Sequence, residues 1–165
     1  MKKIPDAAQI KAWDTETILR QNIKSIDLME RAAAAFVDSL LKELNPYVKD
    51  ILVVCGTGNN GGDGLAIARI LNSSKFFEIK IFVVRHSEKS SPDFDTNLKR
   101  LDQSKNFDIV EIKEKNNLPP VPEDLVIIDA LLGTGLSKPL SGLLSETVDR
   151  SEEHTSELQS PYVIS

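Results

Sequence analysis

The amino-acid sequence predicts a doubly wound α/β domain: a parallel sheet with helices on both faces, preceded by a helical extension. Short, continuous apolar runs, typical of strands buried on both faces, alternate with stretches typical of helices. Of the eight glycines, most gather directly after two of the apolar runs. The length of 165 residues provides for one domain with its own core.

Two helices are expected before the first strand. Residues 6–20 carry a loose apolar pattern, in which Trp13 is expected to anchor packing or to lie on an oligomer surface. A second helix has apolar residues repeating at threes and fours. Ser25 or Asp27 can cap its start, and Pro46 ends it.

Strands and helices then alternate along the chain. A helix is expected at residues 65–71, ending near Asn72, and Ser91 with Pro92 is typical of the start of another helix. An irregular connection and the start of a further helix follow at residues 116–123 and 143. The expected strands are residues 51–55, 79–84, 107–112 and 125–129.

The first glycine-rich segment, residues 56–64, has the Gly-x-Gly-x-x-Gly spacing of a dinucleotide-binding turn between a strand and a helix. Backbone amides at such a turn can bind an anion. Asn59, Asn60 and Asp63 add oxygen acceptors that suit a hard cation, ribose hydroxyls or both, although such residues also form local turn bonds.

Two features separate this segment from better-known phosphate loops. Arg85 and His86 occupy the place at the end of the second strand where a dinucleotide-binding domain usually has an acid. No Gly-Lys-Ser or Gly-Lys-Thr follows the glycines, which excludes a kinase-type P-loop.

The second glycine-rich segment, residues 129–139, begins with Asp129 at the end of a strongly apolar strand. Both segments are expected at the carboxyl edge of the sheet, where α/β folds bind ligands. Asp129 is therefore a candidate acid/base group or cation ligand, or else it caps a turn. Lys138 could meet a phosphate or be a surface lysine, and Cys55 is expected to be a buried strand residue.

Composition restricts the possible partners and compartment. The net charge of −5 disfavours a nucleic-acid partner, and no apolar run is long enough for a membrane span. We see no secretory signal, and the single cysteine cannot form an internal disulfide, which favours a reducing compartment. We therefore expect a cytoplasmic protein that binds neither nucleic acid nor membrane.

The last residues differ from the rest of the chain. Residues 150–160 show neither helical nor strand periodicity and resemble the translation of a common sequencing-adapter oligonucleotide. We expect residues 150–165 to be a foreign tail and the natural protein to continue differently after Asp149. The alternative is a polar C-terminal helix.

Three motifs together resemble one protein family. Residues 56–69 resemble the signature of the NAD(P)H-hydrate epimerases, the YjeF N-terminal domain family. Gln9, Trp13, Asp14 and residues 25–33 resemble the N-terminal helices of the family, and residues 128–136 resemble its second loop. In the same order as in the family, the motifs cover nearly all of residues 4–149. The resemblance implies a Rossmann-like three-layer α/β/α fold with a mostly parallel sheet and an N-terminal helical extension.

The resemblance also implies an activity. Members of the family are isomerases that interconvert the R and S forms of hydrated NADH and NADPH (NADHX and NADPHX), which serves cofactor repair. They bind one potassium ion per subunit and often form homodimers. Their product feeds an NAD(P)H-hydrate dehydratase, which is either fused to the epimerase or separate.

Carried over by motif, the family's functional residues fall on both glycine-rich segments. Asn60 and Asp129 would hold the potassium ion, and Asp129 is also the candidate catalytic acid/base. The substrate would be bound by Asn59, Asn60, Gly61, Gly62, Asp63, Gly133, Thr134, Gly135, Leu136, Ser137, Lys138 and Pro139.

The family pattern continues into a further strand and a loop with an Asp and a Ser-Gly pair, which complete its site. That segment is absent here, so residues 1–149 are expected to form an incomplete epimerase domain with weak or absent activity and poor stability. Two alternatives remain: a non-catalytic YjeF-type module that binds nucleotide or RNA, and an ordinary NAD(P)-binding oxidoreductase domain with Arg85 at the ribose phosphate.

Overall fold

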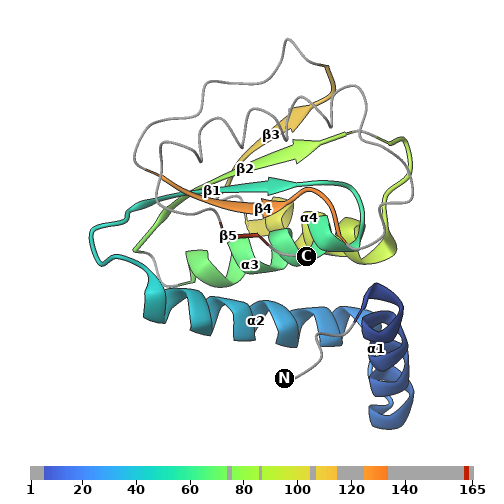
Figure 1. The fold of residues 1–165 in the computed structure, drawn as a ribbon. Helices are drawn as coiled ribbons and strands as arrows, with labels where there is room; N and C mark the ends of the chain where they lie inside the picture. The colour runs from blue at the N-terminus through green and yellow to red at the C-terminus, as the bar shows by residue number, and fades with distance from the viewer. Residues whose placement is uncertain are drawn as a thin grey trace.

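The computed structural model describes residues 6–73, 76–85, 87–104, 107–114, 125–133 and 162–163. Its helices are α1 (Ala7–Gln21), α2 (Ser25–Glu43), α3 (Asn59–Asn72) and α4 (Pro92–Ser104). Its strands are β1 (Asp50–Cys55), β2 (Glu78–Val84), β3 (Asp108–Ile112), β4 (Val126–Ala130) and β5 (Tyr162–Val163). The strands pair in parallel in the order β3-β2-β1-β4-β5, as Figure 1 shows. This is the α/β class with a parallel sheet that the alternation predicts.

The described helices α2, α3 and α4 lie on one side of the sheet (Figure 1), where α3 packs against β1, β2 and β4. Val53 and Ile81 belong to the core cluster on this side and are fully buried. Leu52 and Phe82 belong to a second cluster, on the other face of the sheet, and are also buried. The sheet is thus buried on both faces, which explains why its strands lack polar–apolar alternation. The helix expected from residue 143 lies outside the described residues.

The expected strands are confirmed with ends that differ by one residue, but the expected start of α3 is wrong. The sequence predicts a helix from residue 65, whereas α3 begins at Asn59, with the Gly62 amide donating to the Gly58 carbonyl at 3.1 Å. Glycine lowers helix propensity by about 1 kcal/mol relative to alanine, so three glycines in two turns are typical of a loop. Packing against the strands overrides this local preference.

The helix starts are set by short-range hydrogen bonds. Asp6 caps α1 by accepting from the Gln9 amide at 2.8 Å. Lys24, rather than Ser25 or Asp27, is the cap residue of α2, and the Asp27 carboxylate accepts from the Lys24 amide at 3.1 Å. The expected start of α4 is confirmed, since the Ser91 hydroxyl accepts from the Phe94 amide at 3.1 Å.

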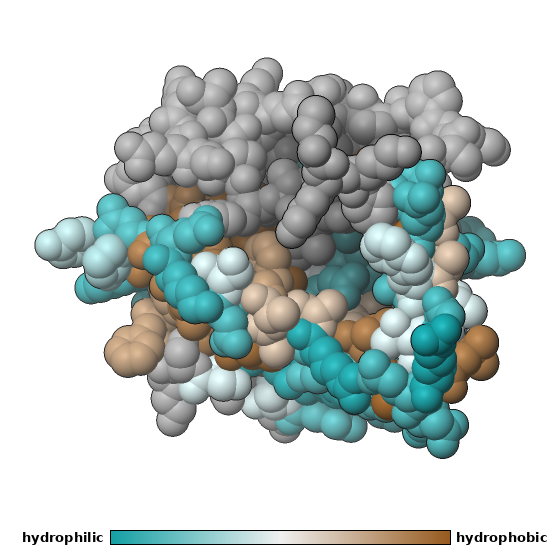
Figure 2. All heavy atoms as spheres, turned by 60° about the horizontal axis from the view of Figure 1, so that its bottom comes forward, coloured by the Kyte–Doolittle hydropathy of each residue, from teal (hydrophilic) through white to brown (hydrophobic). Residues whose placement is uncertain are grey.

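Helix α1 stands at the edge of the domain and makes few contacts with α2 (Figure 1). Trp13 is 57% exposed, so it does not anchor packing within this chain. Figure 2, with the α2 side turned forward, shows apolar residues in separate groups among hydrophilic ones. Over the ranges that the structure describes, no helix is both long and apolar enough to cross a bilayer.

The short strand β5 is an addition to the predicted elements. The sequence pattern indicates no element within residues 150–165, yet Tyr162 and Val163 pair in parallel with Ile128 and Asp129 of β4. A strand of two residues is too short to show a periodic pattern in the sequence. It is defined only by its backbone pairing with the edge of β4. The origin of residues 150–165 stays a prediction.

Candidate functional site

The two glycine-rich segments meet at the carboxyl edge of the sheet. Strand β1 lies between β2 and β4, so the chain order reverses at β1, and ligands of α/β sheets bind at such a point. The Gly56 amide donates to the Ala130 carbonyl at 3.0 Å. The Asn60 side-chain amide donates to the Leu132 carbonyl at 2.9 Å. These two hydrogen bonds join the segment after β1 to the last residue of β4 and to the segment that follows it.

The glycines of the first segment allow α3 to approach the strands closely. A Cβ atom on Gly61 would lie 1.9 Å from the Gly56 carbonyl oxygen. One on Gly64 would lie 2.6 Å from the Cβ of Ala130 and 2.8 Å from the Sγ of Cys55. The N-terminus of α3 is therefore held against the ends of β1 and β4, with its first amides available to an anion.

Asp129 lies at the end of β4, in register with Val54 of β1. Its side chain is half-buried, and one carboxylate oxygen accepts from the Leu131 amide at 2.9 Å. Burial raises the pKa of the Asp129 carboxyl, although the hydrogen bond from Leu131 acts in the opposite direction. A carboxylate in this setting can accept or release a proton, or bind a cation through its remaining lone pairs.

Asp63 lies in a different environment, on the helical side of the site. Its pKa is raised to about 7, mainly by burial and in addition by the carboxylates of Asp14 on α1 and Asp93 on α4. The Ser25 hydroxyl donates to Asp93 at 2.6 Å, which ties the start of α2 to the start of α4. Sequence reasoning missed Asp14 and Asp93 as neighbours of Asp63, because they lie on separate helices with no local pattern that links them.

The remaining predicted substrate residues occupy different environments. Asn59 is exposed at the first position of α3. Gly62 is buried, and a Cβ on it would lie 3.1 Å from the Cε of Met29. Gly133 lies beside Asn60, since its Cβ would be 3.4 Å from the Asn60 Cβ. The predicted substrate residues 134–139 lie outside the described residues, and so does His86.

Arg85 and Cys55 have structural partners. The Arg85 guanidinium donates to Glu111 on β3 at 2.6 Å and lies 5.5 Å from the centre of the Phe94 ring. This hydrogen bond holds the pKa of Glu111 below its ordinary value. Cys55 is fully buried, as expected, and burial raises the pKa of its thiol, with Asp129 adding to the effect. The thiol is therefore an inert strand side chain.

The donor set at the junction suits a hard cation. Within the described ranges, no group of three or more His, Cys, Asp and Glu side chains could hold a metal ion. Asn60 and Asp129 instead offer one amide and one carboxylate beside backbone carbonyls. Hard monovalent or divalent cations prefer such oxygen donors, so the residues present fit potassium better than a transition metal.

The sheet order and the two joined segments define a Rossmann-like α/β domain with a candidate ligand site at the switch point of its strands. The chain belongs to the family described as YjeF-related protein N-terminus, which its sequence matches over residues 25–165. The family resemblance carried by the glycine motifs is thereby confirmed.

Curated relatives match most of the chain. It is 33% identical to an NAD(P)H-hydrate epimerase of Limosilactobacillus reuteri, over 89% of this chain and 66% of the relative. It is 37% identical to one of Oenococcus oeni, over 86% of this chain and 64% of the relative. A bifunctional NAD(P)H-hydrate repair enzyme of Thermofilum pendens is 36% identical over 89% of this chain and 28% of its own length. The chain thus spans slightly less than two thirds of the two epimerases.

A solved structure supports the fold. The crystal structure of the yeast protein YNL200c superimposes with a TM-score of 0.75, covering 94% of this chain and 67% of the yeast chain. The two sequences are 23% identical. At that level of identity, the superposition supports a shared fold and nothing further.

Proposed function

We propose that this protein is an NAD(P)H-hydrate epimerase that interconverts the R and S forms of hydrated NADH and NADPH. The observation that carries the proposal is the junction of the two glycine-rich segments, made by the hydrogen bond from Asn60 to the Leu132 carbonyl. It brings the amides of the α3 start and the carboxylate of Asp129 to one edge of the sheet. Family membership and the names of the curated relatives support the same activity.

The substrate would bind across this junction. The N-terminus of α3 offers amides and partial positive charge for the phosphates of the dinucleotide. Asn59 and Asn60 would bind its polar groups, with Gly61, Gly62 and Asp63 forming the same turn. Gly133 and residues 134–139 would form the second wall of the site.

A potassium ion is part of the proposal, one per subunit. Asn60 and Asp129 would hold it together with carbonyl oxygens of the second segment. The ion would supply positive charge for oxygen atoms of the substrate. Activity that is unchanged when choline replaces potassium would contradict this part of the proposal.

Asp129 is the proposed acid/base group. Epimerisation requires that the configuration at the hydroxyl-bearing carbon be lost and then restored. A carboxylate can assist by taking a proton from the substrate and returning it. Asp129 is suited to this role because it is half-buried, ordered by the Leu131 amide and placed at the switch point.

The proposed biological setting follows from the family. We propose a cytoplasmic homodimer that acts together with an NAD(P)H-hydrate dehydratase, either on the same chain or on another. The bifunctional repair enzyme of Thermofilum pendens supports a fused arrangement in relatives. Analytical ultracentrifugation of the purified protein tests the dimer.

Conversion of one resolved epimer tests the activity directly. The R form of hydrated NADPH is incubated with the purified protein in potassium buffer, and the appearance of the S form is followed by chromatography. We expect weak conversion that is still above the rate in buffer alone, and less conversion by the Asp129→Asn variant. Conversion no faster than in buffer would overturn the proposed function. Binding of NADPH as tight as that of hydrated NADPH would favour an ordinary NAD(P)-binding domain instead.

A further inference from the structure

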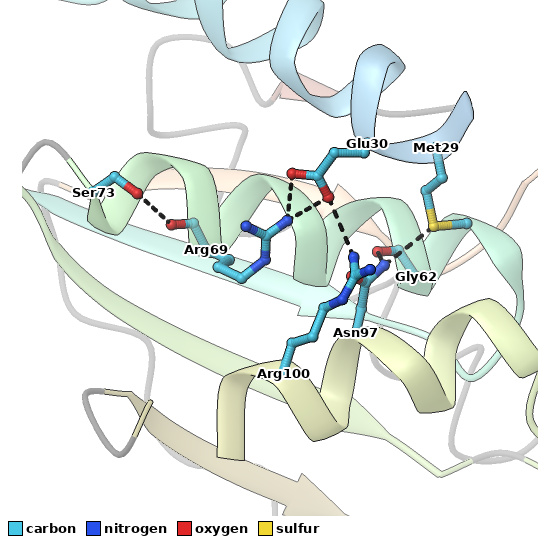
Figure 3. Close-up of polar contacts among 7 residues, drawn as sticks. All are labelled: Met29, Glu30, Gly62, Arg69, Ser73, Asn97 and Arg100. Atoms are coloured by element: carbon cyan, nitrogen blue, oxygen red, sulfur yellow. Dashed lines mark hydrogen bonds and ion pairs between the residues drawn. The ribbon is translucent and has the colours of Figure 1, made fainter. Parts of the chain in front are cut away.

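A buried asparagine connects three helices behind the candidate site. Asn97 on α4 is 1% exposed, in a position that is otherwise part of the apolar stripe of α4 formed by Phe94 and Leu101. Figure 3 shows its side chain directed from α4 toward Gly62 on α3, close to Met29 and Arg100. Burying a side-chain amide destabilises the folded protein unless the amide is hydrogen-bonded. The partners of Asn97 therefore indicate its role.

The Asn97 side-chain nitrogen contacts the beginning of α3. It donates to the Gly62 carbonyl at 3.1 Å and to the Met29 sulfur at 3.3 Å. At the same point the helices cross so closely that a Cβ on Gly62 would lie 3.2 Å from both the Met29 sulfur and the Phe94 amide nitrogen. Gly62 and Asn97 together therefore define where α2 and α4 cross α3.

A charged network orients the Asn97 amide. The Arg100 guanidinium donates to the Asn97 side-chain oxygen at 3.3 Å and to the Glu30 carboxylate at 3.4 Å. Glu30 also forms an ion pair with Arg69 on α3 (Figure 3). With its oxygen directed to Arg100, the amide directs its nitrogen to Gly62. The amide is therefore held in one orientation by Arg100, which is itself paired with Glu30.

This crossing lies within one helical turn of the candidate site. Asn60 is two residues before Gly62 and donates to the Leu132 carbonyl. Gly61, between them, has its α-carbon against the Gly56 carbonyl. Because residues in one helical turn move together, a shift of α3 at Gly62 would change the distance from Asn60 to Leu132.

We infer that Asn97 is a positioning residue for the dinucleotide site. It holds the first turn of α3 against α2 and α4, and so sets the placement of Asn60 opposite the segment after β4. The inference rests on the proposed function for its kinetic consequence, whereas its structural consequence can be measured without substrate. Removing the Asn97 donor should loosen the first turn of α3 while leaving its C-terminal half in place.

The structural test compares two variants by amide hydrogen exchange. Asn97→Leu removes the donor and keeps the branching and number of side-chain heavy atoms, and Leu71→Ala removes a fully buried side chain at the other end of α3. We expect Asn97→Leu to accelerate exchange at residues 62–66 at least tenfold more than at residues 67–72. Leu71→Ala should show the opposite pattern. Equal acceleration of both halves of α3 in Asn97→Leu would overturn the inference.

The kinetic test uses hydrated NADPH as the probe. We expect Asn97→Leu to raise KM about tenfold and to change kcat less than twofold, because the substrate-binding turn moves while Asp129 does not. Leu71→Ala should leave KM within twofold of the original value even where its Tm is lower. If KM rises in proportion to the loss of Tm, and to the same extent in both variants, then Asn97 is a structural residue only. Should the unmodified protein epimerise nothing, the proposed function fails, and hydrogen exchange still decides the role of Asn97.

A second variant covers the case in which Asn97→Leu does not fold. Asn97→Asp keeps the shape of the side chain and the oxygen that faces Arg100, and loses the nitrogen that donates to Gly62. We expect the same selective acceleration at residues 62–66. Exchange in Asn97→Asp that is unchanged at these residues would overturn the inference.

Discussion

The first turn of α3 has two sides that differ in what they contact. On one side, Asn60 donates to the Leu132 carbonyl and lies at the switch point with the end of β4. On the other side, Gly62 is covered by Met29 and accepts a hydrogen bond from Asn97. The comparison teaches that one glycine-rich motif combines a ligand-facing side with a packing side. Substitutions on the packing side should change stability first, and those on the ligand side should change activity first.

The largest expected effect on stability comes from Gly61→Ala. The new Cβ would overlap the Gly56 carbonyl, which is backbone and cannot rotate away. We expect a loss of more than about 4 kcal/mol in the free energy of unfolding, at the extreme of single substitutions, measured by urea denaturation.

Gly58→Ala is the matched control. Gly58 caps the same helix, and among the described residues no atom beyond Gly58 and its two chain neighbours lies within 4 Å of its Cβ position. The poorer cap and the less flexible unfolded chain act in opposite directions, so the change should stay within about 1 kcal/mol. Equal losses in the two variants would show that glycine is needed for backbone freedom rather than for close packing.

The largest expected effect on activity comes from Asp129→Asn. Loss of a positioned acid/base group should lower kcat by about 10²–10⁴-fold. Since burial opposes the charge of Asp129, the neutral amide should leave Tm unchanged or raise it. Epimerisation at the original rate in Asp129→Asn would remove Asp129 from the reaction and leave it as a structural residue.

The pH dependence of stability tests the environment of Asp63. Its pKa of about 7 lies above the ordinary value, so the folded protein binds more protons than the unfolded chain between about pH 4 and 7. This group therefore lowers stability as the pH rises through that window. Asp63→Asn should raise the free energy of unfolding by roughly 1–3 kcal/mol at pH 8 and hardly at all at pH 4. A gain of the same size at both pH values would contradict the raised pKa.

The smallest expected effect concerns Arg85 and Glu111, at the far side of β2 from the junction. The pair is partly exposed, so its coupling free energy should be about 0.2–1 kcal/mol in a double-mutant cycle of Arg85→Met and Glu111→Gln. The coupling should decrease in 1 M salt, and also in acid, at a pH below the ordinary pKa of a glutamate, because Glu111 then takes up a proton. If Arg85→Met weakens binding of NADPH but not of NADH, Arg85 serves a ribose phosphate and the pair is more than structural.

Much of the fold could be predicted because its signals are local. The apolar runs at Ile51 and Ile81 have no alternation, and this is what burial on both faces of a parallel sheet requires. Ser91 followed by Pro92 marked the start of α4 for an equally local reason. The start of α3 could not be predicted in this way, since Gly61 and Gly64 have low helix propensity and are helical only because strands lie against them.

For the candidate site, the sequence by itself determined which residue types stand at or after the ends of β1 and β4, and that Asn60 and Asp129 are among them. It did so because parallel strands place their carboxyl ends at one edge of the sheet. Only the tertiary structure separated Asp63, which lies with Asp14 and Asp93, from Asp129. Only the tertiary structure showed that the Asn97 side chain donates a hydrogen bond to the Gly62 carbonyl. Contacts between helices far apart in the chain depend on crossing geometry, and crossing geometry leaves no local pattern in the sequence.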